Sequence, residues 1–322
     1  MGIKEAIDGF PEQFSYAPVV ENEASLGYVK HAIAVGMGGS HLAADIMASI
    51  CPEKHIMVHT DYGLPAISDD ILRESIVICN SYSGNTEEVL DAFDVTEKRG
   101  ALLAVITTGG KLLLRAKEKG VAFVQLPHID IQPRMALGFH VRALMKLLGM
   151  DEELTQTEAL HERLDTKKAE KEGRRLARAL RGKVPVIYSS RTHAAIAYNW
   201  KIKFNETGKI PAFCNTFPEL NHNEMTGFEN TGKTAPLNEP FHFIFLKDLN
   251  DDPRIQKRMD VCRQLYEKRG FGVDEIIIEG KNNWEKAFSS LLVADFAALN
   301  TALAYEVEPE QVPMVEEFKK MI

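Results

Sequence analysis

The sequence predicts an α/β fold of two domains, each a doubly wound parallel β-sheet with helices on both faces. Short apolar runs rich in β-forming residues alternate with longer helical patterns along the chain. Continuous apolar strands joined by helical crossovers are typical of parallel sheets that are buried on both faces. The length of 322 residues suits two domains, because a domain averages about 150 residues.

In the first half, the predicted strands and helices follow one another as repeated βαβ units. Helices are expected over residues 41–50 and 86–98, after loops at 36–40 and 80–85. The strands predicted in this half are 31–35, 55–59, 75–79, 101–106 and 121–126. We therefore expect a first domain at residues 1–150.

The second half repeats this plan after a change in composition. Residues 151–181 are dense in Glu, Lys and Arg, which predicts one or two solvent-exposed helices joining the halves. The elements expected beyond them are strands at 184–188, 242–246 and 275–279 and helices at 194–204, 284–305 and 315–321. We therefore expect a second domain at residues 151–322. Its similarity to the first is inferred only from the order of its strands and helices.

Composition excludes several classes of protein. Acidic residues (46) outnumber basic ones (38), giving a net charge of −8, whereas nucleic-acid binders normally carry a basic surplus. No uncharged apolar run reaches the roughly 18 residues of a membrane span, and the first residues lack the apolar stretch of a signal peptide. The cysteines form no C-x-x-C pair, which argues against a zinc cluster or a disulfide framework and favours a cytoplasmic protein; they are Cys51, Cys79, Cys214 and Cys262.

Two loops that follow predicted strands of the first domain could hold an anion. Ligands of parallel α/β sheets bind beyond the carboxyl ends of strands, where helix N-termini present N–H groups. The loop Gly36-Met37-Gly38-Gly39-Ser40 is neither a dinucleotide fingerprint nor a P-loop, and a tight turn alone could explain it. In the loop at 80–88, a helix cap would explain Thr86. The cap does not explain Ser81 and Ser83, and the three hydroxyls together suit a phosphate monoester.

The second loop also resembles a known one. Ser81-Tyr82-Ser83-Gly84-Asn85-Thr86-Glu87-Glu88 is similar to the phosphosugar-binding loop of the sugar isomerase (SIS) domain. That domain is a flavodoxin-like α/β sandwich that often occurs in pairs, so the resemblance implies two SIS domains. Its family contains enzymes and sugar-phosphate-sensing regulators, so the loop implies a class of ligand and leaves the reaction open.

A dense polar stretch in the second half could carry chemistry. Acidic residues and one histidine fall within 204–213 and 217–225. A metal site is one interpretation, but H-E-x-x-H spacing is missing, and no P-C-x-x-C follows the H-x-E of a zinc deaminase. A capped, salt-bridged loop would explain any one of these residues. Beside a phosphosugar loop, however, a carboxylate, a histidine and an arginine suffice for aldose–ketose isomerisation without metal or cofactor.

Four motifs in order resemble the bifunctional phosphoglucose/phosphomannose isomerases, an SIS-domain branch of the phosphoglucose isomerase superfamily. They are the two loops of the first domain, Pro133-Arg134-x-Ala136-Leu137-Gly138, and Asn205-Glu206-x-x-Lys209-x-Pro211-Ala212 followed by Pro218-Glu219-x-Asn221-His222-Asn223-Glu224. The resemblance spans most of the chain.

This resemblance implies a role for each matching residue. Glu206 is placed as the base that moves a proton between C2 and C1, and His222 as the ring-opening group contributed by the partner subunit of a homodimer. Arg134 is placed opposite the enediolate, while Glu219 and Glu224 are expected to orient the loop. The positions expected to bind the sugar and its phosphate are Gly38, Gly39, Ser40, Ser81, Ser83 and Thr86.

One segment departs from the family pattern. Where the family often has Asp-Pro-Thr-Pro-Val, this chain has Glu308-Pro309-Glu310-Gln311-Val312, and the threonine is thought to leave room for both C2 epimers. Glu310 therefore puts mannose 6-phosphate in question as a substrate. A lysine of the family's final helix also serves the site, and Lys319 and Lys320 both fit.

The sequence thus predicts a cytoplasmic, homodimeric isomerase of glucose 6-phosphate, and of mannose 6-phosphate, with fructose 6-phosphate. We expect no cofactor, no metal, no membrane and no nucleic acid. Two alternatives stay open at this stage. One is a phosphosugar sensor without catalysis, and the other is an aminosugar-phosphate isomerase or deaminase.

Overall fold

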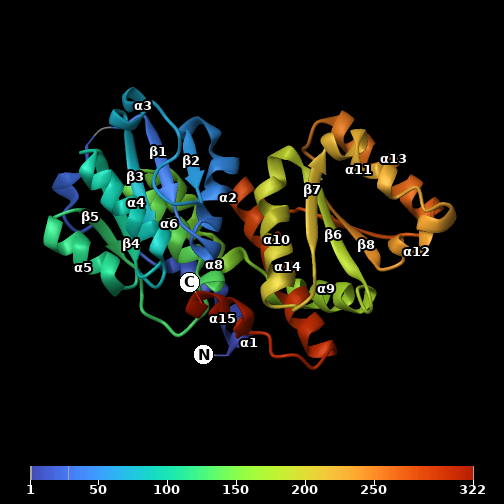
Figure 1. Ribbon diagram of the computed structural model, residues 1–322. Coiled ribbons are helices and arrows are strands. Elements are labelled where there is room, and N and C mark those ends of the chain that lie inside the picture. Colours follow the sequence, from blue (N-terminus) through green and yellow to red (C-terminus); the bar gives the residue numbers. More distant parts are fainter. Residues whose placement is uncertain (1, 28, 322) are drawn as a thin grey trace. The chain divides into compact units, whose positions relative to one another are not determined.

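A computed structural model describes residues 2–27 and 29–321 (Figure 1). The chain forms two compact units, of which unit 1 ends at Arg163 and unit 2 begins at Leu164. The sequence had suggested a boundary after residue 150. The difference arises because the buried Arg142 donates from Nη1 to the carbonyl oxygen of Leu154 (2.9 Å) and to Thr157 Oγ1 (3.1 Å), which joins the following helix to unit 1.

Unit 1 is built around a parallel sheet. Its strands are β1 (His31–Val35), β2 (Ile56–His59), β3 (Ser75–Asn80), β4 (Leu102–Thr107) and β5 (Ala122–Gln125). Within the described residues the order is β2-β1-β3-β4-β5, with every neighbouring pair parallel. This is the flavodoxin-like order, in which the chain reverses its winding direction between β1 and β3. The predicted fold class is confirmed, and each strand lies within one or two residues of its predicted range.

Helices cover both faces of this sheet. The helices of unit 1 are α1 (Ile3–Asp8), α2 (Leu42–Ile50), α3 (Asp69–Arg73), α4 (Glu87–Lys98), α5 (Gly110–Lys119), α6 (Leu137–Leu147), α7 (Asp151–Glu158) and α8 (Leu160–Arg163). Alternate strand residues such as Val77 and Val105 pack with Phe93 of α4 and Leu112 of α5 in one core. Helices α2 and α6 pack together, and α6 contacts β4 and β5. Successive strand residues point to opposite faces, and helices bury both faces. This explains why the strands appear as continuous apolar runs in the sequence.

Unit 2 has a smaller sheet of the same winding. Its strands are β6 (Val184–Ser190), β7 (Phe213–Phe217), β8 (Phe241–Lys247) and β9 (Gly272–Ile277). Within residues 164–321 the order is β7-β6-β8-β9, all parallel. The order of these four strands matches that of β2-β1-β3-β4 in the unit 1 sheet. This match supports the similarity between the two domains that was inferred from element order. The edge strand β7 was not predicted, because Asn215 and Thr216 interrupt its apolar residues.

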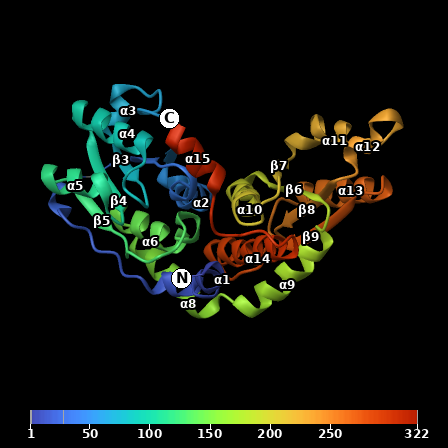
Figure 2. The same ribbon diagram turned by 60° about the horizontal axis from the view of Figure 1, so that its bottom comes forward.

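The helices of unit 2 are α9 (Thr166–Ala179), α10 (Ala194–Glu206), α11 (Glu224–Gly227), α12 (Ala235–Asn238), α13 (Pro253–Lys268), α14 (Asn283–Ala304) and α15 (Pro313–Met321). An aromatic core joins β6 and β8 to α13 through Tyr188, Phe243 and Tyr266. On the other face α14 packs against α9 and α10 (Figure 2). By length and composition α14 could span a membrane, but 72% of that stretch is buried within the protein, and it packs against α9 and α10 as a core helix.

Candidate active site

The two loops singled out in the first domain lie side by side at the switch point of the unit 1 sheet. They follow β1 and β3, which are neighbours in the sheet. Ser40 joins them, because its Oγ accepts a hydrogen bond from the Tyr82 N–H (3.1 Å) and its carbonyl oxygen accepts one from Asn80 Nδ2 (2.7 Å). Ligands of doubly wound sheets bind at this position.

The hydroxyl loop leaves the start of α4 without a side-chain cap. Thr86 occupies the N-cap position of α4, yet its side chain caps no backbone N–H within the described chain. Instead Thr86 Oγ1 lies 2.8 Å from Ser81 Oγ, which also accepts from the Gly84 N–H at 3.1 Å. The alternative of a simple capping threonine is therefore wrong. The first N–H groups of a helix have no intrahelical partners, so α4 presents donors beside two hydroxyls, as an anion requires.

Close packing explains the glycine of this loop. Gly84 has φ +68°, and a Cβ there would lie 1.8 Å from the carbonyl oxygen of Gly109. Any side chain would collide with that backbone, so only glycine allows the loop to close. The neighbouring Ser83 is exposed, and its Oγ accepts from the Asn85 N–H at 3.3 Å. The loop is thus held in shape by backbone contacts while Ser83 faces outward.

Arg134 lies beside the first loop. It belongs to the short 3-10 helix η5 (Pro133–Met135), which contacts the 3-10 helix η3 (Gly38–Ser40). A Cβ on Gly39 would meet the Arg134 backbone nitrogen at 2.6 Å, so glycine is required there for this approach. The Arg134 residue is only 3% exposed. Gly38 is exposed with φ +53°. Within unit 1, the structure therefore places Arg134 against the first loop, which Ser40 joins to the hydroxyl loop.

Glu206 is the last residue of α10 in unit 2, and two buried contacts fix that helix. Lys203 Nζ lies 2.6 Å from Asp295 Oδ1 of α14, with both side chains at least 96% buried. Trp200 Nε1 donates to Ser290 Oγ of the same helix at 3.0 Å. Glu206 itself is half-buried. The position of Glu206 is therefore set by α10, which is held against α14 by these two buried contacts.

His222 ends the 3-10 helix η7 (Glu219–His222), and its side chain is exposed. The loop around it is held by Glu224, whose carboxylate accepts hydrogen bonds from the buried Tyr188 hydroxyl and from Asn215 Nδ2. Asn223 Nδ2 donates to Glu219 Oε1 at 2.8 Å. Both glutamates thus form hydrogen bonds within the loop or to its supporting strands, while His222 is exposed.

Topology separates Glu206 from His222 within one chain. A crossover helix runs antiparallel to the strands that it joins, so α10 ends at the amino edge of its sheet, before β7. His222 follows the carboxyl end of β7. A strand of five residues spans about 16 Å. The structure therefore does not bring the carboxylate and the imidazole of one chain together.

The C-terminal segment is also ordered by side-chain contacts. The Glu308 carboxylate accepts from the Glu310 N–H (2.7 Å) and the Gln311 N–H (2.6 Å). In α15, Lys319 Nζ lies 2.9 Å from Glu316 Oε1, and Lys320 is exposed. These contacts do not distinguish the two lysines as site residues.

Comparison with known proteins connects this arrangement to a family. Residues 169–322 match the family model of the bacterial phospho-glucose isomerase C-terminal SIS domain. A bifunctional phosphoglucose/phosphomannose isomerase of Aquifex aeolicus is 33% identical over 99% of this chain and 97% of its own. One from Caldicellulosiruptor bescii is 32% identical over 99% of this chain and 98% of its own.

This chain belongs to the bifunctional phosphoglucose/phosphomannose isomerase family. Membership makes it an isomerase and confirms the resemblance found in the sequence. The solved structure of a glucosamine-6-phosphate deaminase from Thermotoga maritima has a TM-score of 0.67 at 14% identity, covering 97% of this chain and 96% of that one. At that identity the likeness concerns the fold alone.

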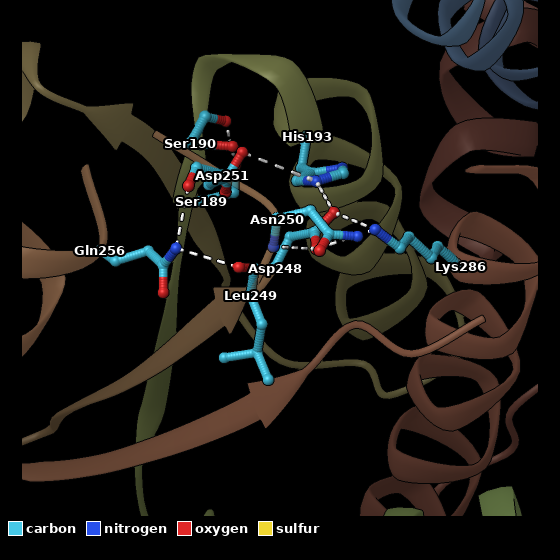
Figure 3. A network of polar contacts seen from close by, with 9 residues as sticks. All are labelled: Ser189, Ser190, His193, Asp248, Leu249, Asn250, Asp251, Gln256 and Lys286. Atoms are coloured by element: carbon cyan, nitrogen blue, oxygen red, sulfur yellow. Dashed lines mark hydrogen bonds and ion pairs between the residues drawn. The ribbon is translucent and has the colours of Figure 1, made fainter. Parts of the chain in front are cut away.

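The second sheet of this isomerase-family member also has a switch point, between β6 and β8, and a buried ion network occupies it (Figure 3). Asp248, directly after β8, lies 2.9 Å and 2.8 Å from Lys286 Nζ through its two oxygens. His193 Nε2 lies 3.0 Å from Asp248 Oδ2 and 4.0 Å from Asp251 Oδ1. Sequence analysis missed this network, although acidic residues directly after a strand were visible.

Within this network Asp248 is paired with Lys286. Burial raises the pKa of Asp248, but hydrogen bonds from Lys286 and from the Asn250 N–H outweigh it, so the net pKa is lowered and the carboxylate stays ionised. Burial raises the pKa of Asp251. An aspartate thus fills the position where unit 1 offers hydroxyls.

One group of possible metal ligands exists among the described residues. Atoms of Cys51, Glu53 and Glu153 lie within 4.8 Å of one another. Burial, with Glu53 and Glu153 adding, raises the pKa of Cys51 to about 12, so the thiol stays protonated at neutral pH. A protonated thiol is a poor metal ligand, and the group lies outside the loops described above.

Removing the Thr86 hydroxyl should weaken substrate binding by this isomerase. In Thr86→Val the side chain keeps its shape but loses its bond to Ser81 and the hydroxyl that we expect to contact the phosphate. Hydrogen bonds to charged groups contribute about 1.5–3 kcal/mol, so KM should rise about 10- to 100-fold with a smaller change in kcat. Steady-state kinetics check this. Ser68→Ala, which removes the N-cap hydroxyl of α3, should leave KM unchanged, and an unchanged KM in Thr86→Val would contradict phosphate binding here.

Proposed function

We propose that this protein interconverts glucose 6-phosphate and mannose 6-phosphate with fructose 6-phosphate through a cis-enediol. Membership of the bifunctional isomerase family carries the proposal. The uncapped start of α4 beside Ser81 and Thr86 supports binding of a phosphorylated sugar in unit 1. The substrate phosphate is held by the hydroxyls of this loop and by the helix N–H groups.

The reaction needs only side chains of the chain itself. His222 transfers a proton between the ring oxygen and the O1 hydroxyl, which opens the sugar ring. Glu206 then removes the proton from C2 while the C1 carbonyl takes up the electron pair, giving an enediolate whose charge faces Arg134. The O2 hydroxyl proton passes to O1, and Glu206 returns its proton at C1, which leaves the carbonyl at C2. Bonds and charges balance without a metal or an organic cofactor.

We further propose that the active enzyme is a cytoplasmic homodimer in which His222 serves the partner's site. The exposure of His222 supports this, as does its separation from Glu206 of the same chain by the length of β7. The four cysteines, all unbridged, suit a reducing compartment.

Dual specificity has a simple physical basis. The two aldose phosphates differ only in configuration at C2, and removal of the C2 proton gives both the same enediol. Accepting both epimers therefore needs space around C2, whereas rejecting one needs a specific contact. Glu310, in place of the family's threonine, is the residue through which such a contact would act.

A coupled assay tests the function directly. Purified full-length protein is assayed on glucose, mannose and fructose 6-phosphates and on glucosamine 6-phosphate, with and without EDTA. We expect turnover of the neutral hexose phosphates, unchanged by EDTA, and none of the aminosugar. Turnover of glucosamine 6-phosphate alone would favour an aminosugar enzyme. Thermal stabilisation by the sugar phosphates without any turnover would favour a sensor.

A further inference from the structure

One lysine joins the end of α10 to the C-terminal segment of the chain. Lys209 Nζ donates a hydrogen bond to the carbonyl oxygen of Glu206 (2.6 Å) and another to the carbonyl oxygen of Gln311. The first of these residues is the proposed base. The second lies in the segment 308–312, where this chain departs from its family. The ammonium group thus links Glu206 to Gln311, which lies 102 positions beyond Lys209 in the chain.

The local backbone is shaped to place this ammonium. Lys209 has φ +56°, a left-handed conformation that is uncommon for a residue with a side chain. The chain reverses tightly before it, since a Cβ on Gly208 would lie 2.8 Å from the Phe204 carbonyl oxygen. Asn205 Nδ2 closes the turn by donating to the Ile210 carbonyl oxygen at 3.0 Å. A cation at this place also interacts favourably with the carbonyl end of the α10 dipole.

The C-terminal segment is shaped on its own side as well. The Glu308 carboxylate accepts hydrogen bonds from the N–H groups of Glu310 and Gln311, which fixes the backbone next to the Gln311 carbonyl. Further back, the Tyr305 hydroxyl accepts from the Gly182 N–H at 2.6 Å. Hydrogen bonds from Gly182 to Tyr305 and from Lys209 to Gln311 thus hold this part of the chain at the amino edge of the unit 2 sheet. The bond from Lys209 is the one nearer to Glu206.

We propose that Lys209 is a positioning residue for the isomerisation, fixing Glu206 and the segment that carries Glu310 relative to each other. This inference rests on the proposed function. Without the ammonium, two carbonyl groups lose a shared donor, and both the last turn of α10 and the 308–312 segment gain freedom. A displacement of about 1 Å in a catalytic group can cost a factor of 100 in rate. Lys209 acts through Glu206 and needs no contact with the substrate.

The test compares three variants of the full-length enzyme. Lys209→Met keeps most of the aliphatic stem and removes the charge, whereas Lys209→Arg restores a cation able to reach two carbonyls. Lys201→Met is the matched control, because Lys201 lies on α10 and its ammonium sits over the Tyr198 ring at 5.4 Å. Each variant is measured for kcat, KM, the ratio of mannose to glucose 6-phosphate turnover, and hydrogen exchange of residues 305–321.

In Lys209→Met we expect kcat to fall about 10-fold or more with KM changed less than threefold. The epimer ratio should shift, and exchange at 308–312 should become faster. Lys209→Arg should recover most of the kcat, and Lys201→Met should match the unsubstituted enzyme.

If hydrogen exchange in Lys209→Met is faster but kcat and the epimer ratio are normal, the positioning role is wrong. Lys209 would then only hold the C-terminal segment in place. Unchanged exchange would overturn the tie itself. If the unsubstituted protein shows no isomerase activity, the proposed function and the catalytic part of this inference both fail. Hydrogen exchange then still decides whether Lys209 holds the C-terminal segment.

Discussion

Glu206→Gln should lower kcat for every hexose 6-phosphate by about 10²–10⁴-fold, the range attributed to a general base. Glutamine keeps the size of the side chain but cannot accept the C2 proton. Since the hydroxyl loop that we propose to hold the phosphate lies in unit 1, binding of fructose 6-phosphate should change little. Calorimetry measures that binding. NMR in D₂O follows the exchange of the C2 proton of glucose 6-phosphate for deuterium, and in the variant this exchange should become undetectable.

The control for this variant is Glu279→Gln. Glu279 pairs with Lys168 on the surface, its side chain is 64% exposed, and its loss should leave kcat unchanged. A kcat for Glu206→Gln within twofold of the unsubstituted enzyme would show that another group is the base.

Mixing the Glu206→Gln variant with His222→Ala extends this experiment to the dimer. If His222 serves the partner's site, a mixed dimer contains one site with both groups intact. Random mixing should then restore about a quarter of the normal activity. No recovery after dissociation and reassembly would place both groups in the same chain's site, against the topology of β7.

Asp248→Asn should destabilise unit 2 by about 3–5 kcal/mol, the usual cost of breaking a buried ion pair. The variant leaves Lys286 charged, and that side chain is only 8% exposed. Urea unfolding followed by tryptophan fluorescence reports this unit specifically, because both tryptophans, Trp200 and Trp284, lie in it. A loss below 1 kcal/mol would contradict the role given to the network.

The exposed counterpart is Asp260→Asn. The Asp260 side chain is 42% exposed and pairs with Lys247, which keeps Glu275 as a second partner at 3.6 Å. Surface pairs contribute about 0–1 kcal/mol, so this variant should be nearly as stable as the unsubstituted protein.

The pH dependence of the Asp248 effect has a defined sign. The pKa of Asp248 is lower in the folded state than its ordinary value, so its stabilisation is fully present above the unfolded pKa of about 4. It is lost as pH falls through the folded value. The stability difference between the unsubstituted protein and Asp248→Asn should therefore shrink below about pH 4. A difference that stays constant over that range would contradict the lowered pKa.

The strands were predictable because their signal is local. A strand such as β3, Ser75–Asn80, is buried along its whole length, so it reads as an unbroken apolar run. The edge strand β7 escaped prediction because Asn215 and Thr216 interrupt the pattern, and only the ladder with β6 makes it a strand. Contacts of α7 and α8 with the helices of unit 1, including the bonds from the buried Arg142, likewise join residues 151–163 to that unit, which a composition change could not reveal.

The sequence by itself determined the fold class, the hydroxyl loop and the family, because these depend on neighbouring residues and on local hydrogen bonds. Only the tertiary structure decided that Thr86 bonds to Ser81 and does not cap α4, that Lys209 reaches Gln311, and that Asp248 is neutralised by Lys286. It also placed Glu206 and His222 at opposite ends of β7. Such pairings arise when strands and crossover helices bring distant residues to one edge of a sheet, and spacing along the chain carries no record of them.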